Sequence, residues 1–387
     1  MKVTKKIRTQ YDVVVVGARI AGASTAMLLA RNGLSVLLID RGFRGKDTLS
    51  THALMRPGIL QLQRWGLLDE LRKTDTPPVR KTTFHYGNET LPIDIKSKDG
   101  VDALYAPRRF VIDTLVADAA EKAGADLLYK TTLSKVETDE SGRVIGVIVL
   151  DEDGNKVRVL CDHLIGADGL HSAVARDVNA ETLHRCEHFT SSIYGYFDCD
   201  ENNGYHWYFD QSAASGLIPT NGGQACIFAS FSSSLAPSVR AIGKDIVFER
   251  ILENSASPLA ELVRKNPLKA QLMMFYGNPG FIRKSAGPGW SLVGDAACFK
   301  DPITAHGMTD ALRDAEFLAR SICYGKASVA NQTGVVESLQ KEFVRTSEAI
   351  ASFEWELPSL KEQHISLSRL MSSEYEQLLH LDSIACV

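Results

Sequence analysis

The first forty residues carry a clear pattern of hydrophobic and polar positions. A run of apolar, mostly β-branched residues at 11–16 predicts a buried parallel strand. A glycine-bearing turn follows at 17–22, and apolar residues at helical spacing then predict a helix over 21–31. A second apolar run at 34–39 predicts another strand, which ends in Asp40. The pattern therefore indicates a strand–turn–helix–strand unit.

This unit has the form of a dinucleotide-binding fingerprint. Free N–H groups and the helix dipole attract an anion, so we expect a pyrophosphate at the helix start and a ribose hydrogen-bonded to Asp40. Arg19 stands where the usual pattern has its middle glycine. Its guanidinium either binds a phosphate or another group near the ligand, or it points into solvent. The candidate cofactor contacts here are Gly17, Arg19, Ile20, Ala21, Gly22, Asp40 and Arg41.

Two later segments repeat the arrangement of an apolar strand that ends in a glycine–aspartate pair. In residues 164–172 the strand runs into Gly-Ala-Asp-Gly, and Ser172 is a suitable N-cap for the helix that follows. In residues 289–308 the strand ends in Gly-Asp, and a loop leads to a glycine just before a helical run over 309–322.

The middle of the chain has a different texture. Alternating aromatic and polar residues predict strands at 192–197, 205–209 and 225–229. Between them, a stretch with glycine and proline at 216–219 predicts a turn. A smaller piece, 79–105, is expected to join the same sheet.

The tail, residues 335–381, is biased towards helix, and Pro358 interrupts it. Its candidate buried positions are Phe343, Phe353, Trp355 and Leu360. The pattern leaves open whether these side chains pack on the core or on a second subunit, so the oligomeric state stays open between monomer and homodimer.

Composition narrows the classes of protein. The chain has 387 residues and a net charge of −4, which gives no reason to expect nucleic acid as a partner. Its seven cysteines include no Cys-x-x-Cys pair, so we expect neither a disulfide framework nor a metal site. No apolar run approaches the roughly 20 residues of a membrane span, and no signal peptide is apparent. We therefore expect a cytoplasmic protein.

The three segments, taken together, resemble a known family. The first unit, then GADGLHSAV, then GWSLVGDAACFKDPITAHGMTDALRDAE occur in the order typical of FAD-dependent monooxygenases of the p-hydroxybenzoate hydroxylase fold. The segment 108–113 resembles the Arg-x-x-Leu-Asp helix start of these enzymes. The likeness spans roughly residues 10–325, within a superfamily that also holds geranylgeranyl reductases and flavin-dependent halogenases. Arg19, Cys298 and the run 304–306 depart from the hydroxylase pattern.

The resemblance implies an α/β fold: a Rossmann-like FAD-binding domain, an antiparallel substrate sheet and C-terminal helices. It implies FAD-binding parts at 1–78, 107–178 and 286–325, substrate-sheet parts at 79–106 and 179–285, and a helical segment at 326–387. Non-covalent FAD and NAD(P)H are the expected cofactors. Asp295 would bind the ribityl chain and Pro302 would lie at the ring edge. The further implied cofactor contacts are Arg109, Asp168, Gly169, Gly294, Gly307 and Met308.

The resemblance also implies a reaction. FAD reduced by NAD(P)H would react with O2 to give a C4a-hydroperoxyflavin that hydroxylates a small aromatic or polyketide-like substrate. His206 is a candidate proton acceptor, and Arg56 a candidate contact to substrate or flavin. The remaining candidate substrate contacts are Tyr194, Tyr205, Trp207 and Tyr208. His52 lies with Arg56 in the loop 47–58, which approaches the flavin in this fold.

Three other functions remain open. A halogenase usually carries Trp-x-Trp-x-Ile-Pro, which is missing from this sequence. A geranylgeranyl reductase-like enzyme shares the fold and is harder to exclude. A non-catalytic flavin-binding redox sensor would bind FAD without turning over a reductant.

Overall fold

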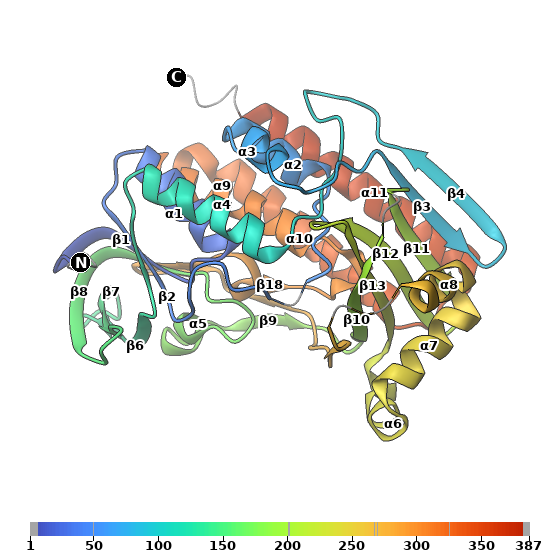
Figure 1. Cartoon of the computed structure of the whole chain (residues 1–387). Helices are drawn as coiled ribbons and strands as arrows, with labels where there is room; N and C mark the ends of the chain where they lie inside the picture. Colours follow the sequence, from blue (N-terminus) through green and yellow to red (C-terminus); the bar gives the residue numbers. More distant parts are fainter. Residues whose placement is uncertain are drawn as a thin grey trace.

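The computed structural model describes residues 7–381 apart from Leu49, Asp200, Glu201, Pro267, Lys269 and Gly325, and at 326–336 it describes the backbone alone. Cys386 lies outside this part. The fold is α/β, as predicted, with two large sheets side by side (Figure 1). Helices α1, α4 and α9 lie along one face of the first sheet, and α11 reaches across to the second.

The first sheet holds the predicted parallel strands. Val14 of β1 pairs with Leu37 of β2 on one side and with Leu164 of β8 on the other. The path from β17 through β8, β1 and β2 to β5 is parallel, while β7 and β6 extend it as an antiparallel ribbon. In spatial order the strands are β16 (Ala286–Gly287), β17 (Trp290–Leu292), β8 (Lys156–Gly166), β1 (Gln10–Val16), β2 (Val36–Asp40) and β5 (Asp126–Tyr129), with β7 (Val144–Leu150) and β6 (Thr132–Thr138) branching from β8.

The second sheet has seven strands and is antiparallel except where β3 pairs parallel to β11. It includes the predicted aromatic strands, and the piece around 79–105 joins it through β3 and β4. Its order is β14 (Met273–Phe275), β10 (Thr190–Asp198), β13 (Gln224–Ser232), β12 (Ala213–Thr220), β11 (Tyr205–Asp210), β3 (Lys81–Tyr86) and β4 (Glu89–Asp94). A three-stranded sheet of β18 (Cys298–Phe299), β15 (Phe281–Arg283) and β9 (Thr182–Arg185) is separate from both.

The predicted turn at 216–219 is wrong, because these residues lie inside strand β12. Glycine is required there for space: a Cβ on Gly216 would stand 2.7 Å from the carbonyl oxygen of His206. Pro219 stands one residue before the end of β12, beyond Leu217, where the pairing of β12 with β11 ends. Glycine and proline marked close packing and a strand end instead of a turn.

The helices fill the space around both sheets. They are α1 (Ile20–Arg31), α2 (Arg56–Arg64), α3 (Leu68–Arg72), α4 (Arg109–Lys122), α5 (Ala173–Asp177), α6 (Ala236–Ile242), α7 (Lys244–Ser255), α8 (Ser257–Lys265), α9 (Gly307–Tyr324), α10 (Lys326–Ala351) and α11 (Leu357–His380). One core joins the first sheet to α1, α2, α4, α9 and α11. On the second sheet, α7 and α8 pack on one face, while α10 and α11 pack on the other.

The tail is helical, as predicted, and packs on the chain itself. Pro358 lies in the first turn of α11, where its missing N–H costs no hydrogen bond. Phe343 and Leu360 are fully buried, and Phe353 and Trp355 are half-buried against the second sheet. Within the described residues no helix combines the length and apolar character of a membrane span.

Candidate functional site

The glycine-rich turn between β1 and α1 packs directly on the glycine–aspartate segment 164–172. Gly17 has a φ of +106°, and a Cβ there would stand 2.3 Å from the carbonyl oxygen of Ala167. A Cβ on Gly22 would stand 1.8 Å from the carbonyl oxygen of Gly17. Neither position can hold a side chain, so two of the sequence-predicted segments meet at the start of α1.

Arg19 occupies the middle glycine position of the pattern without backbone strain. Its φ of −88° and ψ of −172° are extended values that any residue adopts. It is the one exposed residue in the stretch 11–30. Burial raises the pKa of Asp113 and Asp295, and the charge of Arg19 opposes the shift at both carboxylates. Arg19 therefore acts electrostatically on the groups around the start of α1.

Helix α4 supports that helix start from the side. The backbone N–H of Ile20 donates to Asp113 Oδ1 (3.2 Å), and Arg109 forms an ion pair with Asp113 at 3.0 Å. Arg109 lies one turn before Asp113, so both side chains fall on one face of α4. The pair fixes the position of Arg109 beside the predicted pyrophosphate site.

The acids at the ends of β2 and β8 bind backbone N–H groups. Asp40 accepts from Ala18 N (2.8 Å) and Gly42 N (2.7 Å), which ties the glycine-rich turn to β2. Arg41, the next residue, is exposed.

Asp168 accepts from Ala173 N (2.6 Å) and from the hydroxyl of Ser172. Ser172 in turn accepts from Ala175 N (2.9 Å), which confirms the predicted N-cap of α5. Gly169 beside it has a φ of +79°. Asp168 thus orders the turn that faces Gly17.

The third segment exposes only two residues in the stretch 291–310, and they are Asp295 and Gly307. Gly294 has a φ of +62°, and its Cβ would stand 2.9 Å from Ala21 Cβ and 3.8 Å from Ala311 Cβ. The start of α9, with the buried Met308, therefore lies beside the start of α1. Although Asp295 keeps exposed surface, enough protein surrounds its carboxylate for burial to raise its pKa.

The loop that joins Asp295 to α9 is anchored to the second sheet. Asp301 accepts from Thr190 N (2.6 Å), from the Thr190 hydroxyl (2.8 Å) and from Ile303 N (2.9 Å). Burial raises the pKa of Asp301 to about 6. Pro302 opens the short turn Pro302–Thr304, and Ala305 has a φ of +50°. Sequence reasoning missed Asp301, because an aspartate before proline is a common turn signal.

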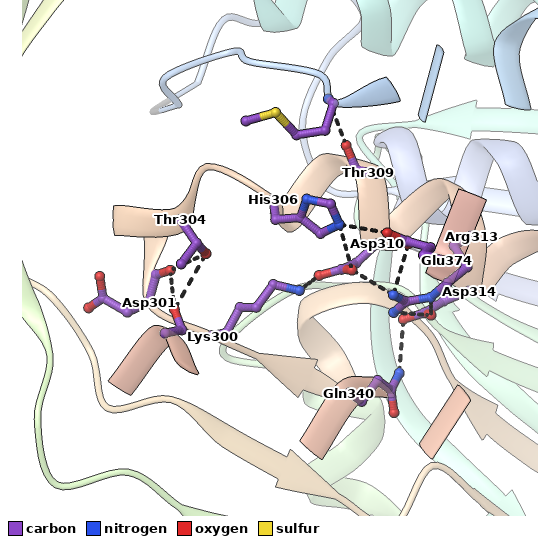
Figure 2. Close-up of polar contacts among 12 residues, drawn as sticks. Lys300, Asp301, Thr304, His306, Thr309, Asp310, Arg313, Asp314, Gln340 and Glu374 are labelled. Atoms are coloured by element: carbon purple, nitrogen blue, oxygen red, sulfur yellow. Dashed lines mark hydrogen bonds and ion pairs between the residues drawn. The ribbon is translucent and has the colours of Figure 1, made fainter. Parts of the chain in front are cut away.

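A buried group of charged side chains follows this loop. Figure 2 shows this charge cluster, which consists of Lys300, His306, Asp310, Arg313, Asp314 and Glu374. His306 Nε2 lies 2.8 Å from Glu374 Oε2, and Arg313 Nη1 bridges Glu374 (2.9 Å) and Asp310 (2.8 Å). Lys300 pairs with the other oxygen of Asp310. Glu374 comes from α11, about seventy residues after His306, so the sequence alone could not bring the two together.

A mostly apolar cavity of about 550 Å³ lies between the second sheet and α11. Ile303 and Thr304 of the anchored loop form part of its wall, and Arg56 lies at the start of α2 on another side. Arg56 donates to the carbonyl oxygen of Val101 (3.2 Å). Other lining residues are Tyr205, Trp207 and Phe209 from β11, and His364, Met371 and Tyr375 from α11.

Alternation along β11 separates the predicted substrate contacts. Tyr205 and Trp207 line the cavity, whereas His206 and Tyr208 line a second hollow beside α8 on the other face of the sheet. His206 Nδ1 contacts His85 Nε2 at 3.2 Å. The structure therefore does not bring His206 to the cavity.

Sequence reasoning missed His364. Its Nδ1 is hydrogen-bonded to the hydroxyl of Tyr86 (2.8 Å), and the ring packs against Phe209 with centroids 4.6 Å apart. Burial lowers the pKa of His364 to about 4, so the imidazole is neutral at physiological pH. The sequence around His364 predicts only an amphipathic helix, so nothing in it indicates that this histidine lines the cavity.

His52 belongs to a separate buried contact. It has a φ of +67° and is hydrogen-bonded through Nε2 to the hydroxyl of Tyr196. Tyr194, two residues before Tyr196 on β10, is buried in the core on the cavity face of the sheet. The Arg108 guanidinium lies 3.6 Å from the Tyr196 ring centroid. Burial lowers the pKa of His52 well below its ordinary value.

Comparisons with known proteins agree with this arrangement. A family model described as FAD binding domain matches residues 10–339. The chain is 27% identical over 354 residues to digeranylgeranylglycerophospholipid reductase of Methanosarcina mazei, covering 86% of this chain and 79% of that protein.

Two solved structures share the fold. The flavin-dependent brominase Bmp2 superposes with a TM-score of 0.77 at 18% identity, covering 94% of this chain and 93% of that one. PqsL of Pseudomonas aeruginosa, in complex with 2-aminobenzoylacetate, gives a TM-score of 0.75 at 20% identity, covering 96% and 99%.

The residues present fit FAD. Packing at Gly17 and Gly22 brings the backbone to the helix start where a pyrophosphate binds, and Arg19, Asp295 and Gly307 are the isolated exposed points around it. Because the family model covers most of the chain, the protein belongs to the FAD binding domain family of FAD-dependent oxidoreductases.

Proposed function

We propose that the protein is an FAD- and NAD(P)H-dependent monooxygenase that hydroxylates an apolar substrate with an aromatic or polyketide-like part. One observation carries this proposal. The loop from Pro302 to Gly307 contributes Ile303 and Thr304 to the apolar cavity and ends at the exposed Gly307 beside Asp295. A substrate in the cavity would therefore lie against the loop that reaches the FAD site.

Bound FAD supplies the redox chemistry and the activation of oxygen. The chain's own residues would bind the flavin and the substrate, orient them and shield them from water. The start of α9 favours negative charge at its exposed N–H groups. The aromatic wall from β11 and the helix α11 exclude water from the cavity. Pro302 offers no N–H to its surroundings, and Asp301 holds the loop against the sheet.

His364 is the candidate group for orienting a polar part of the substrate. With a pKa of about 4 it is too weak a base to remove a proton from a phenol, which titrates near 10. As a neutral imidazole it can instead exchange hydrogen bonds with a substrate hydroxyl and with Tyr86. Arg56 lies in the same wall, where its guanidinium would be the counter-charge for an acidic substituent.

Turnover under labelled oxygen gas tests this proposal. With NAD(P)H and a panel of phenols and longer apolar aromatics, we expect one labelled oxygen atom in the product. Conversion of the true substrate without oxygen, driven by the reductant alone, would overturn the proposal.

A second candidate is reduction of carbon–carbon double bonds in an isoprenoid chain. The cavity is mostly apolar, which suits such a chain, and a related protein is named as a digeranylgeranylglycerophospholipid reductase. The anaerobic arm of the same experiment separates the two, because only a reductase consumes its substrate there.

A further inference from the structure

Among the side chains that the structure describes, the charge cluster holds one more negative charge than positive charges. Asp310, Asp314 and Glu374 supply three negative charges, while Lys300 and Arg313 supply two positive ones. The side chains of Glu374 and His306 are fully buried, and that of Arg313 is 1% exposed. An unbalanced charge in such surroundings is costly, so the cluster has a place for one more positive charge.

His306 is the member that can supply this charge. Its Nε2 faces Glu374 and lies 3.6 Å from Asp310, and its buried Nδ1 has no hydrogen-bond partner among the described residues. Phe343 of α10 stacks on the ring at 4.6 Å, and Gln340 of the same helix donates to Asp314. Burial lowers the pKa of His306 despite the opposing charge of Glu374, so the ring is neutral in the present state.

The neighbouring groups do not provide the missing charge. Burial raises the pKa of the Cys298 thiol to about 12, so it stays neutral. Burial and repulsion from Arg313 lower the pKa of Lys300 to about 8, so its positive charge is already counted at neutral pH. Burial would raise the pKa of Glu374, but its contacts with His306 and Arg313 outweigh this effect and keep it ionised. Asp301 is turned away, towards Thr190.

The cluster is also connected to the FAD site. His306 immediately precedes Gly307, the exposed first residue of α9. The charges of Lys300 and Asp314 both act on the pKa of Asp295. A negative charge added near the start of α9 would therefore favour the protonated form of His306.

We propose that His306 takes up one proton when the bound flavin is reduced, so that the charge cluster balances the negative charge gained at the start of α9. A hydride from the nicotinamide cofactor, or two electrons from dithionite together with one proton from water, gives the flavin one negative charge. One further proton from water then binds Nδ1 of His306, and no other bond changes. Glu374 is a positioning residue, because it holds the imidazole through Nε2. This inference rests on FAD binding in the proposed function.

The test is the midpoint potential of the FAD-bound protein as a function of pH, measured below pH 8, where Lys300 remains charged. In the wild type we expect an interval in which the potential falls more steeply with pH, because reduction there takes up an extra proton. His306→Gln should lack this interval, and Glu374→Gln should move it to lower pH. If Asp301 took up the proton instead, the steep interval would remain in the His306→Gln variant. Glu362→Gln, an exposed charge on α11, is the matched control and should keep the wild-type profile.

Proton uptake from a weakly buffered solution with an indicator dye, during anaerobic reduction by dithionite and after subtraction of the protons that dithionite oxidation releases, gives a second readout. If a variant does not fold, the measurement on the wild type still tests the inference. Proton uptake by the wild type that does not depend on pH across the same range would overturn it. A tightly bound divalent ion in the purified protein would also overturn it, since the ion would supply the balancing charge. A steep interval without oxygen incorporation would contradict the monooxygenase and leave this inference standing.

Discussion

At the scale of single residues, the site is marked by exposure more than by residue type. Arg19, Asp295 and Gly307 are isolated exposed positions in stretches that are otherwise buried. Glycine at positions 17 and 22 is required by contact, while the extended backbone at Arg19 accepts a side chain. The departure from the usual glycine pattern is therefore compatible with FAD binding.

Replacing Arg19 tests what its guanidinium does. If it faces a phosphate, Arg19→Ala should weaken FAD binding severalfold, and the loss should shrink as salt rises, because the charge is exposed. Titration of flavin fluorescence at two salt concentrations measures this. Arg250→Ala removes an exposed charge on α7 and serves as the control. Equal affinities for wild type, Arg19→Ala and Arg19→Gly would show that Arg19 is only solvated.

Replacing Asp295 tests the third segment. The Asp295→Asn variant keeps the shape but loses a charge-assisted hydrogen bond to the ribityl chain, worth about 1.5–3 kcal/mol. We expect FAD affinity to fall roughly ten- to a hundredfold. An unchanged FAD titration would mean that Asp295 does not contact the cofactor.

At the scale of elements, the loop between β18 and α9 is held by buried hydrogen bonds to a different sheet. Asp301 joins it to β10, and the charge cluster joins its far end to α11. The loop thus has fixed points on both sides, which suits a segment that positions one ligand against another.

Asp301 gives the loop a measurable pH signature. Its pKa of about 6 lies above the value near 3.9 in an unfolded chain, so the folded protein binds more protons between these two pH values. The stability contributed by this group is therefore complete below about pH 4 and is lost as pH rises through 6, by roughly 2–3 kcal/mol. We expect urea unfolding at both ends of this range to show that the free energy of unfolding of Asp301→Asn, relative to that of the wild type, is higher at the higher pH. A constant difference between the two would contradict the assignment.

Local sequence patterns predicted the elements well where one period dominated. The strands β1 and β2, the helix between them and the Ser172 cap follow from spacing and residue type alone. The turn at 216–219 was wrong because glycine and proline also occur where strands pack closely or end. Local patterns carry no information on which distant segment fills the space.

At the scale of the whole molecule, the unpredicted parts of the site come from long-range contacts. His364 and Glu374 both lie on α11, near the end of the chain. His364 lines the cavity, and Glu374 is hydrogen-bonded to His306. His206 lies on the face of β11 that is turned away from the cavity, because neighbouring residues of a strand point to opposite faces of the sheet. The motifs mark the segments that meet at the start of α1, whereas the cavity depends on how the sheet and tail pack together.

The central claim is that one loop, Pro302 to Gly307, joins the apolar cavity to the FAD site. The most direct measurement is the difference spectrum of the FAD-bound protein during titration with 2-naphthol, a flat apolar probe that carries a hydroxyl. We expect a saturable shift of the flavin bands, and loss of 2-naphthol binding when Trp207→Arg fills the cavity. Saturable binding of 2-naphthol in the cavity with no change in the flavin spectrum would contradict the account.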